Sequence, residues 1–295
     1  MRRFGDVMSA MAKTIQIFLP SGDPRGIRVA EITTRIVRVI EVPRSLVTEF
    51  LAMPEAKQVG IYFLVGDTGD EENPQLYIGQ SGGVGDRLIN HNKNKDFWNR
   101  ALVAVSLTNS LTQTHGLFLE WVSIRDALAA GRYALENGNS GSQPYTPAPL
   151  QADCHEIHDT IGTLLATLGH PVFTPVAKKA LGAELTTDEE FFFCKASGSN
   201  GVGLYTEEGF VVLKGSFGRL AAVPSLKESS LQFRQRVIDA GAAHAEGDLL
   251  VFVKDHLFRS PSMAAVALLG RSANGWIEWK DKDGKTLDEL KRQGN

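Results

Sequence analysis

The sequence predicts an α+β fold, in which a small antiparallel sheet is flanked by helices and a separate α+β module follows at the C-terminus. Three observations carry this prediction. Short apolar segments at 60–65, 76–80 and 101–107 are rich in β-branched and aromatic residues and are bounded by turn residues, which is typical of strands. Apolar residues between 110 and 130 recur at helical spacing. The polar segment 179–190 then separates two regions that each contain predicted strands and helices.

The chain has 295 residues, of which 43% are hydrophobic and 22% charged, a composition ordinary for a globular protein of two or three domains. No apolar run reaches the length of about 18 residues that a membrane span needs, and the first residues lack the apolar core of a secretory signal, so no membrane association is expected. Two cysteines are too few for a disulfide framework. These features indicate a cytoplasmic protein, and they leave its oligomeric state open.

Residues 1–57 are predicted to form an N-terminal β-rich segment. The stretches 13–20 and 27–43 alternate between apolar and polar residues and contain many β-branched side chains, which predicts two or three strands. Residues 43–56 predict a short helix, with Pro43 in its first turn. We expect this segment to pack on the hairpin that follows it and to carry no chemistry.

The strands at 60–65 and 76–80 are joined by residues 66–73, which are rich in Gly, Asp, Glu and Asn and predict a β-hairpin with a long loop. Each strand contains a tyrosine. Side chains alternate along a strand, so Tyr62 and Tyr77 share one face if they pair opposite each other. The hairpin is therefore expected to place two phenols side by side.

A helix is predicted over 86–92, directly after a glycine-rich link. Arg87 and His91 are four residues apart and therefore share one face of this helix. The helix begins close to the end of the hairpin, so local geometry is expected to gather both side chains near the two phenols.

The helix predicted near 110–130 has an apolar stripe, formed by Leu117, Trp121, Ile124 and Leu128. At a turn of about 100° per residue, Glu120 lies roughly 60° from the centre of that stripe, at the margin of the expected buried face. A carboxylate in such a position needs an ion pair, a hydrogen bond or a metal ion. Glu120 is therefore a candidate metal ligand, although a salt bridge is the more common role of a glutamate beside such a stripe.

The C-terminal module is predicted to combine strands with helices. One of its helices has a full set of terminal signals: Ser260 caps it, Pro261 occupies its first turn and Gly270 ends it. A hairpin that contains Trp276 and Trp279 is expected after this helix, with at least one of the two tryptophans in the core.

The net charge of −3 at pH 7 is unevenly distributed along the chain. Residues 1–50 contain 8 basic and 5 acidic side chains, 51–189 contain 9 and 16, and 190–295 contain 14 and 13. An acidic middle segment repels nucleic acid unless a metal ion and a local group of cations offset its charge. Lys93, Lys95 and Arg100, which follow His91 in the sequence, are candidates for that group. They are equally consistent with a solvated helix end.

Four features occur in the order seen in the GIY-YIG nuclease family: Gly60-Ile61-Tyr62, Tyr77-Ile78-Gly79, Arg87 and the helical Glu120. The sequence resembles that family over about residues 58–135, within a domain that we predict at 58–178. Two positions differ from the family pattern. Gln80 stands where many relatives have a lysine, and Ala134 follows Arg132-Tyr133 where an asparagine is expected. The nearest substitutes are Asn137 and Asn139.

This resemblance implies a metal-dependent DNA endonuclease that hydrolyses phosphodiester bonds with Mg²⁺ or Mn²⁺. Tyr62 would accept a proton from the attacking water, with His91 as a relay and with its phenol pKa lowered by a neighbouring cation. Tyr77 would orient a phosphate oxygen, Arg87 would stabilise the developing charge, and Glu120 would hold the metal ion. The alternative is a protein whose nuclease fold is inactive and which binds DNA or senses its modification.

The C-terminal region resembles a module of unassigned function, DUF4357, which is found on GIY-YIG proteins. The resemblance covers about residues 190–290, in a domain predicted at 190–295, and it is carried by 209–216, 260–262, 270–272 and 274–276. The end of this pattern is also similar to the RAMA module of restriction and DNA-methylation proteins. These likenesses imply contact with DNA, and we expect Arg271 and Asn274 to make it, together with Lys93 and Lys95.

Overall fold

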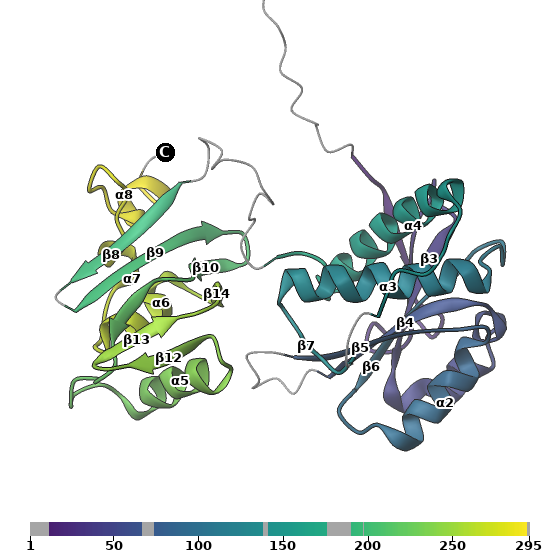
Figure 1. Ribbon diagram of the computed structural model, residues 1–295, viewed down its shortest axis with the longest axis horizontal. Coiled ribbons are helices and arrows are strands. Elements are labelled where there is room, and N and C mark those ends of the chain that lie inside the picture. Colours follow the sequence, from purple (N-terminus) through teal and green to yellow (C-terminus); the bar gives the residue numbers. More distant parts are fainter. Residues whose placement is uncertain (1–11, 67–73, 138–140, 176–189, 197, 294–295) are drawn as a thin grey trace, which may run out of the picture. The chain divides into compact units, whose positions relative to one another are not determined.

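The computed structural model describes residues 12–66, 74–137, 141–175, 190–196 and 198–293 (Figure 1). The chain divides into two compact units, residues 1–174 (unit 1) and 175–295 (unit 2). Both units combine sheets with helices, which confirms the predicted α+β class. The predicted hairpin loop at 66–73 and the predicted linker at 179–190 lie almost wholly outside the described residues.

Unit 1 contains one seven-stranded sheet with the order β1-β2-β3-β6-β4-β5-β7. Its strands are β1 (Ile15–Phe18), β2 (Arg28–Ile32), β3 (Val37–Pro43), β4 (Gly60–Gly66), β5 (Gln75–Ser81), β6 (Arg100–Ser106) and β7 (Ala134–Leu135). Neighbouring strands are antiparallel except β5 and β7, which are parallel. The sheet is therefore mixed and larger than the small antiparallel sheet that was predicted.

The strands of the predicted N-terminal segment belong to this same sheet. β3 pairs with β6 along its whole length, from Val37 opposite Ser106 to Pro43 opposite Arg100. β6 in turn pairs with β4. The described part of this segment, residues 12–57, therefore does not form a separate layer on the hairpin, because its β-branched strands extend the sheet that contains it.

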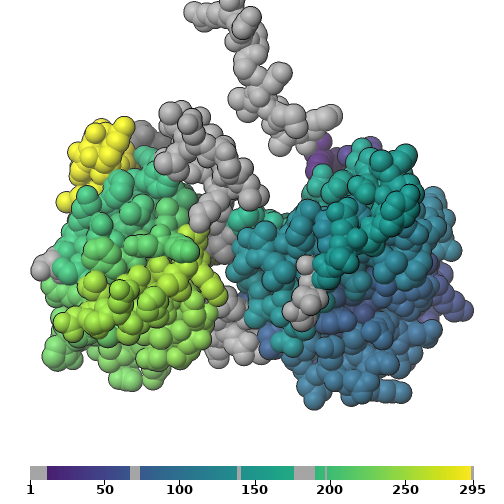
Figure 2. All heavy atoms as spheres, in the orientation of Figure 1, coloured from purple at the N-terminus to yellow at the C-terminus, as the bar shows by residue number. Residues whose placement is uncertain are grey.

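Helices cover both faces of the unit 1 sheet (Figure 1). α1 (Val47–Leu51) and α2 (Val84–Asn94) lie on one face, whereas α3 (Gln113–Ala130) and α4 (Ala148–Thr167) lie side by side on the other. The atoms of α3 and α4, coloured teal, form much of the surface of unit 1 in the space-filling view (Figure 2). A strand that is buried on both faces needs apolar residues at every position, which explains the uninterrupted apolar run of β4.

Alternation along β4 decides which side chain meets which helix. Ile61 and Phe63 contact the core under α3 and α4, whereas Tyr62 and Leu64 contact the core under α2. The tyrosine of the first motif is therefore directed toward α2, the helix that contains Arg87.

The apolar stripe predicted for α3 is wrong at its ends, since Leu117 and Leu128 are 41% and 54% exposed. The buried side chains of α3 include Phe118, Leu119 and Val122. The helix packs against both the sheet and α4, so its buried arc is rotated and wider than a stripe against one surface. Its N-terminal cap is Thr112, which forms a capping box with His115.

Unit 2 contains a second sheet, in the order β12-β13-β11-β9-β10-β14, with β8 paired to β9. Its strands are β8 (Phe191–Ala196), β9 (Ser199–Thr206), β10 (Gly209–Val212), β11 (Phe217–Arg219), β12 (Ala243–Glu246), β13 (Leu249–Phe252) and β14 (His256–Phe258). Its helices are α5 (Glu228–Asp239), α6 (Pro261–Leu269), α7 (Gly275–Glu278) and α8 (Leu287–Lys291). In the part of the chain that the structure describes, no helix is long and apolar enough to cross a membrane.

The terminal signals read for α6 are confirmed. The Ser260 side chain accepts a hydrogen bond from the Met263 backbone at 3.3 Å, and Gly270 ends the helix in the left-handed conformation. The predicted hairpin is wrong at Trp276, because residues 275–278 form the short helix α7, whereas an antiparallel bridge between Lys280 and Thr286 encloses a turn just beyond Trp279. Trp279 is buried in the core, whereas Trp276 is half-buried at the surface.

A buried carboxylate joins α4 to the sheet of unit 1. Glu41 on β3 is 1% exposed and forms ion pairs with Arg28, with Arg100 at 3.7 Å and with His170 at 3.5 Å. Arg28 also donates to the carbonyl oxygen of Leu168 at 3.2 Å, at the end of α4. Burial alone would raise the pKa of Glu41, but the hydrogen bond from His170 and the Arg28 cation outweigh it and lower the pKa below its ordinary value.

Replacing Glu41 by Gln should destabilise unit 1 by about 3 kcal/mol, because Arg28 would lose its buried partner. The Glu41 contribution is fully present above the unfolded-state pKa of about 4.3 and is lost as the pH falls through the lower folded-state value. Urea unfolding between pH 3 and pH 7 measures both effects. Glu156→Gln is the matched control, since Glu156 pairs with Arg35 on the surface and should contribute less than about 1 kcal/mol.

Candidate active site

The two motif tyrosines come from neighbouring strands but do not face each other directly. In the register of β4 and β5, Tyr62 lies opposite Gly79 and Leu64 lies opposite Tyr77. The predicted direct pairing of the tyrosines is therefore wrong by two residues. A shift of two residues preserves the face, so both rings still lie on the α2 side, with centroids 6.3 Å apart.

The register also explains the glycine of the second motif. A Cβ atom at Gly79 would lie 2.3 Å from the hydroxyl oxygen of Tyr62 and 2.5 Å from its ring carbon Cζ. The Tyr62 ring therefore lies directly over Gly79, and no larger residue fits beneath it. Tyr62 and Gly79 are a cross-strand pair in which the glycine provides the space for the ring.

Helix α2 brings the other two predicted side chains onto Tyr62. The hydroxyl oxygen of Tyr62 lies 2.9 Å from Nε2 of His91, and Nε of Arg87 donates to the same oxygen at 3.4 Å. His91 is only 5% exposed, and its ring centroid lies 5.1 Å from that of Tyr77. The predicted spacing of Arg87 and His91 on one helix face thus produces a cluster of four side chains around one phenol.

Burial determines the protonation of this cluster. It lowers the pKa of His91 to about 4, with Arg87 and Lys95 adding to the effect, so the imidazole is neutral at pH 7. Nε2 of a neutral His91 can then accept the hydroxyl proton of Tyr62. Burial also raises the pKa of Tyr62, and the hydrogen bond from Arg87 only partly offsets this. The expected lowering of the phenol pKa by a neighbouring cation is thus present, but burial outweighs it and the net shift is upward.

Glu120 reaches the same cluster from α3. Burial raises its pKa, against the opposing effects of a hydrogen bond with the Gln80 backbone and of the Arg87 cation. The Gln80 side chain accepts a hydrogen bond from Gln113, in the first turn of α3, at 2.6 Å. The structure thus brings five predicted catalytic side chains into one region. They are Tyr62, Tyr77, Arg87, His91 and Glu120.

Glu120 is the candidate metal ligand at this place. Among the described residues, no group of three or more His, Cys, Asp or Glu side chains could hold a metal ion. A single half-buried carboxylate fits Mg²⁺ or Mn²⁺ when the other ligands are water and substrate phosphate, which is how magnesium is commonly held. It does not fit a structural zinc site, which needs four protein ligands.

The four residues predicted to bind DNA lie in different surroundings. Lys95 lies at the candidate site, with its ammonium 4.4 Å from the centroid of the Tyr77 ring, whereas Lys93 is an exposed residue of α2. Arg271 pairs with Glu278 at 2.8 Å in unit 2. Asn274 caps α7 by accepting a hydrogen bond from the Trp276 backbone. The side chains of Arg271 and Asn274 thus both have partners within unit 2.

Two residues near the site have roles that the sequence did not reveal. Asn137 accepts a hydrogen bond from the Ile78 amide at 2.9 Å and donates to the Ile78 carbonyl at 2.8 Å, so its side chain extends the sheet beside the second motif. Asn137 was one of two candidate substitutes, and Asn139 lies outside the described residues. Arg44 binds the end of α2, a contact between positions too distant in sequence for any local pattern to indicate.

Replacing Gly79 by Ala should displace the Tyr62 ring and break its hydrogen bond to His91. We expect a loss of about 1–3 kcal/mol in unfolding free energy, as for other overpacked cores, and a change in the His91 pKa measured by NMR. Gly82→Ala is the control, because a Cβ atom at Gly82 would meet only the Gln113 side chain, at an ordinary 3.6 Å. Equal effects of the two substitutions would contradict this account of Gly79.

Comparison with known proteins adds a family match for unit 2. Residues 192–291 match the family described as Domain of unknown function (DUF4357). No curated protein and no solved structure matches the chain. The predicted resemblance to DUF4357 is therefore confirmed, while the candidate site lies outside the matched residues.

Proposed function

We propose that unit 1 is a metal-dependent DNA nuclease of the GIY-YIG type. The observation that supports this most directly is the hydrogen bond between Tyr62 and His91, with a second hydrogen bond from Arg87 to the same phenol and with Glu120 acting on it electrostatically. A buried tyrosine that is hydrogen-bonded to a neutral imidazole and a guanidinium, with a carboxylate near enough to raise its pKa, is a set of groups suited to hydrolysing a phosphate ester. The family match to unit 2 assigns no activity, so the proposal rests on this arrangement and on the order of the motif residues.

The proton path follows from the protonation states. Tyr62 donates its hydroxyl proton to Nε2 of His91 while its oxygen accepts a proton from the attacking water. The phenol therefore never has to exist as a free phenolate, whose formation the buried site opposes. A bound phosphate anion would offset the two nearby cations, Arg87 and Lys95, and so raise the pKa of His91 toward that of a useful base.

Arg87 and Tyr77 would act on the phosphate. The guanidinium of Arg87 contacts the Tyr62 oxygen and also interacts with Tyr77, so it lies where negative charge develops during attack. Tyr77 is half-exposed, which leaves its hydroxyl able to hydrogen-bond a phosphate oxygen.

Glu120 would hold Mg²⁺ or Mn²⁺ beside the substrate. Such an ion neutralises charge on the leaving oxygen when it is bound. The carboxylate suits this purpose because its raised pKa reflects a negative charge with insufficient compensation, which a divalent cation would supply. Arg271 and Asn274 are not included as DNA ligands in the proposal, since both already have partners within unit 2.

The first test is cleavage of supercoiled and linear DNA by the full-length chain. Cutting should require Mg²⁺ or Mn²⁺, and EDTA or Glu120→Gln should abolish it without changing the fold. Glu49→Gln, at an exposed position of α1, is the matched control and should cut normally. Cutting at the wild-type rate in EDTA would rule out the metal requirement, whereas DNA binding without cutting would favour the alternative of an inactive DNA-binding or modification-sensing protein.

Removal of single hydroxyl groups separates the roles of the two tyrosines. Tyr62→Phe should lower the cleavage rate by roughly 10²–10⁴-fold, the usual cost of losing a proton-transfer group. Tyr77→Phe should cost less, because Arg87 also interacts with the phosphate. Both variants keep the ring, so their unfolding should stay close to that of the wild type. Near-normal cutting by both would mean that the hairpin tyrosines are structural.

The pH dependence of cleavage tests His91 as the proton acceptor. Only the neutral imidazole can accept a proton, so kcat/KM should fall as the pH falls through the free-enzyme pKa of about 4, well below the ordinary histidine value of about 6.5. The limb of the kcat profile should lie at higher pH, because bound phosphate raises the pKa. A kcat/KM limb at an ordinary histidine pKa would contradict the assignment.

A further inference from the structure

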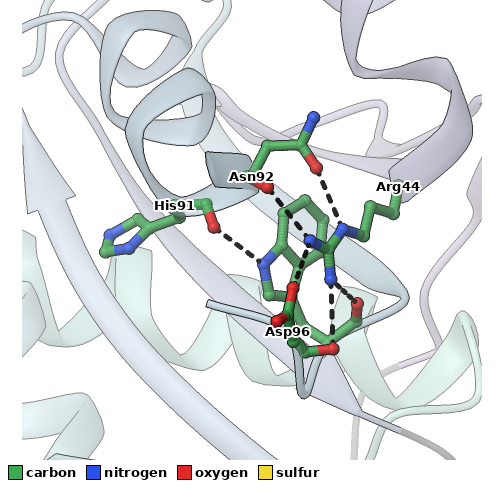
Figure 3. Close-up of polar contacts among 5 residues, drawn as sticks. Arg44, His91, Asn92 and Asp96 are labelled. Carbon is green, nitrogen blue, oxygen red and sulfur yellow. Dashed lines mark hydrogen bonds and ion pairs between the residues drawn. The ribbon is translucent and has the colours of Figure 1, made fainter. Parts of the chain in front are cut away.

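The Arg44 side chain lies against the C-terminal end of α2. There it binds Asn92 and two residues that follow the helix, Asp96 and Trp98 (Figure 3). Its guanidinium donates to the side chain and the backbone carbonyl of Asn92 at 2.9 and 3.0 Å. It also donates to the carbonyl oxygens of Asp96 and Trp98 at 3.1 and 3.2 Å. The same group lies 5.0 Å from the centroid of the Trp98 ring.

The contact with Asn92 satisfies a carbonyl group in the last turn of α2. Trp98, which is buried, donates from its indole nitrogen to the carbonyl oxygen of His91 at 3.5 Å, and Arg44 takes the next carbonyl along the helix (Figure 3). A cation at this end also interacts favourably with the helix dipole. Arg44 also donates to the Asp96 carboxylate at 3.3 Å, and these five hydrogen bonds from one planar guanidinium fix the path of residues 92–98 far more tightly than a single contact could.

The fixed segment contains Lys95. Its backbone amide donates to the His91 carbonyl at 3.0 Å, and its side chain turns back across the site. The ammonium lies 4.4 Å from the centroid of the Tyr77 ring and 5.8 Å from that of Phe97. The ring faces hold the cation in place without neutralising its charge.

We propose that Lys95 is a phosphate-binding residue of the candidate active site and that Arg44 is the residue that positions it. This inference rests on the proposed function for the identity of the anion, a phosphodiester of DNA. Lys95 and Arg87 both interact with His91, so together they supply two cations around one anion site. Lys93 is the natural comparison, because it carries the same charge two residues away and is exposed.

The charges around His91 provide a readout that needs neither DNA nor catalysis. The groups that interact with it are Tyr62 from β4, Tyr77 from β5, and Arg87 and Lys95 from α2 and its end, while Glu120 from α3 acts on Tyr62. Lys95 lowers the pKa of His91, so its removal should raise that pKa. A substitution of Arg44 that displaces Lys95 should also raise the pKa of His91.

The experiment compares Lys95→Met with Lys93→Met in the full-length chain. Binding of a short DNA duplex is measured in EDTA, where no cutting is expected, and the His91 pKa is measured by NMR on the free protein. Lys95→Met should weaken binding roughly tenfold, the size of one charge-assisted hydrogen bond, and raise the His91 pKa. Lys93→Met should leave the pKa unchanged and weaken binding much less.

A double-mutant cycle tests the positioning by Arg44. In an Arg44→Lys background, which keeps the charge and removes the planar fork, Lys95→Met should have little further effect on binding. Asn92→Ala is a milder change at the same contact, since it removes only the side-chain acceptor, and it serves if Arg44→Lys does not fold. It should reduce the effect of Lys95→Met in the same direction.

Each outcome decides the inference. Equal effects of the two lysine substitutions would overturn it, because diffuse electrostatic attraction would then suffice. A full Lys95→Met effect in the Arg44→Lys or Asn92→Ala background would overturn the positioning role. A wild-type chain that does not bind the duplex would overturn the phosphate assignment. Binding that depends on Lys95 and Arg44 without any cutting would support this inference and remove the proposed nuclease reaction.

Discussion

The contact between the Tyr62 ring and Gly79 is the constraint on which the arrangement of the site depends. The ring can lie flat across β5 only because the opposite position has no side chain. In that orientation its hydroxyl points to α2, where His91 and Arg87 meet it. A larger residue at position 79 would lift the ring and separate the phenol from the imidazole. The geometry of the cluster therefore follows from a backbone requirement in the strand beneath it.

Local patterns in the sequence were sufficient to predict most of the site. The hairpin and the helix that follows it gather Tyr62, Tyr77, Arg87 and His91 within a short stretch of chain, so neighbouring elements bring them together. Glu120 was placed at the edge of a buried face and is half-buried in the structure, although the stripe used to place it was wrong at both ends. The helix period fixes which residues share a face, but the direction of that face depends on the partner elements.

Local sequence patterns could not predict contacts between distant parts of the chain. Arg44 reaches Asn92, and Asn137 reaches Ile78, through hydrogen bonds that neither sequence neighbourhood indicates. The protonation of the site was also mispredicted. Charge alone suggested that Arg87 would lower the phenol pKa, but the extent of burial, which no local pattern gives, determines the sign.

The position of β6 within the sheet has a consequence for any shortened form of the protein. A fragment that began at residue 58 would keep every motif residue yet lose β3, the strand that pairs with β6 along its whole length. The backbone groups of β6 on that side would face water, and its uninterrupted apolar side chains would make it an exposed edge prone to aggregation. Such a fragment would also lose Arg44 and Glu41. A shortened form that keeps β6 covered must therefore include β3, and so must begin well before the first motif.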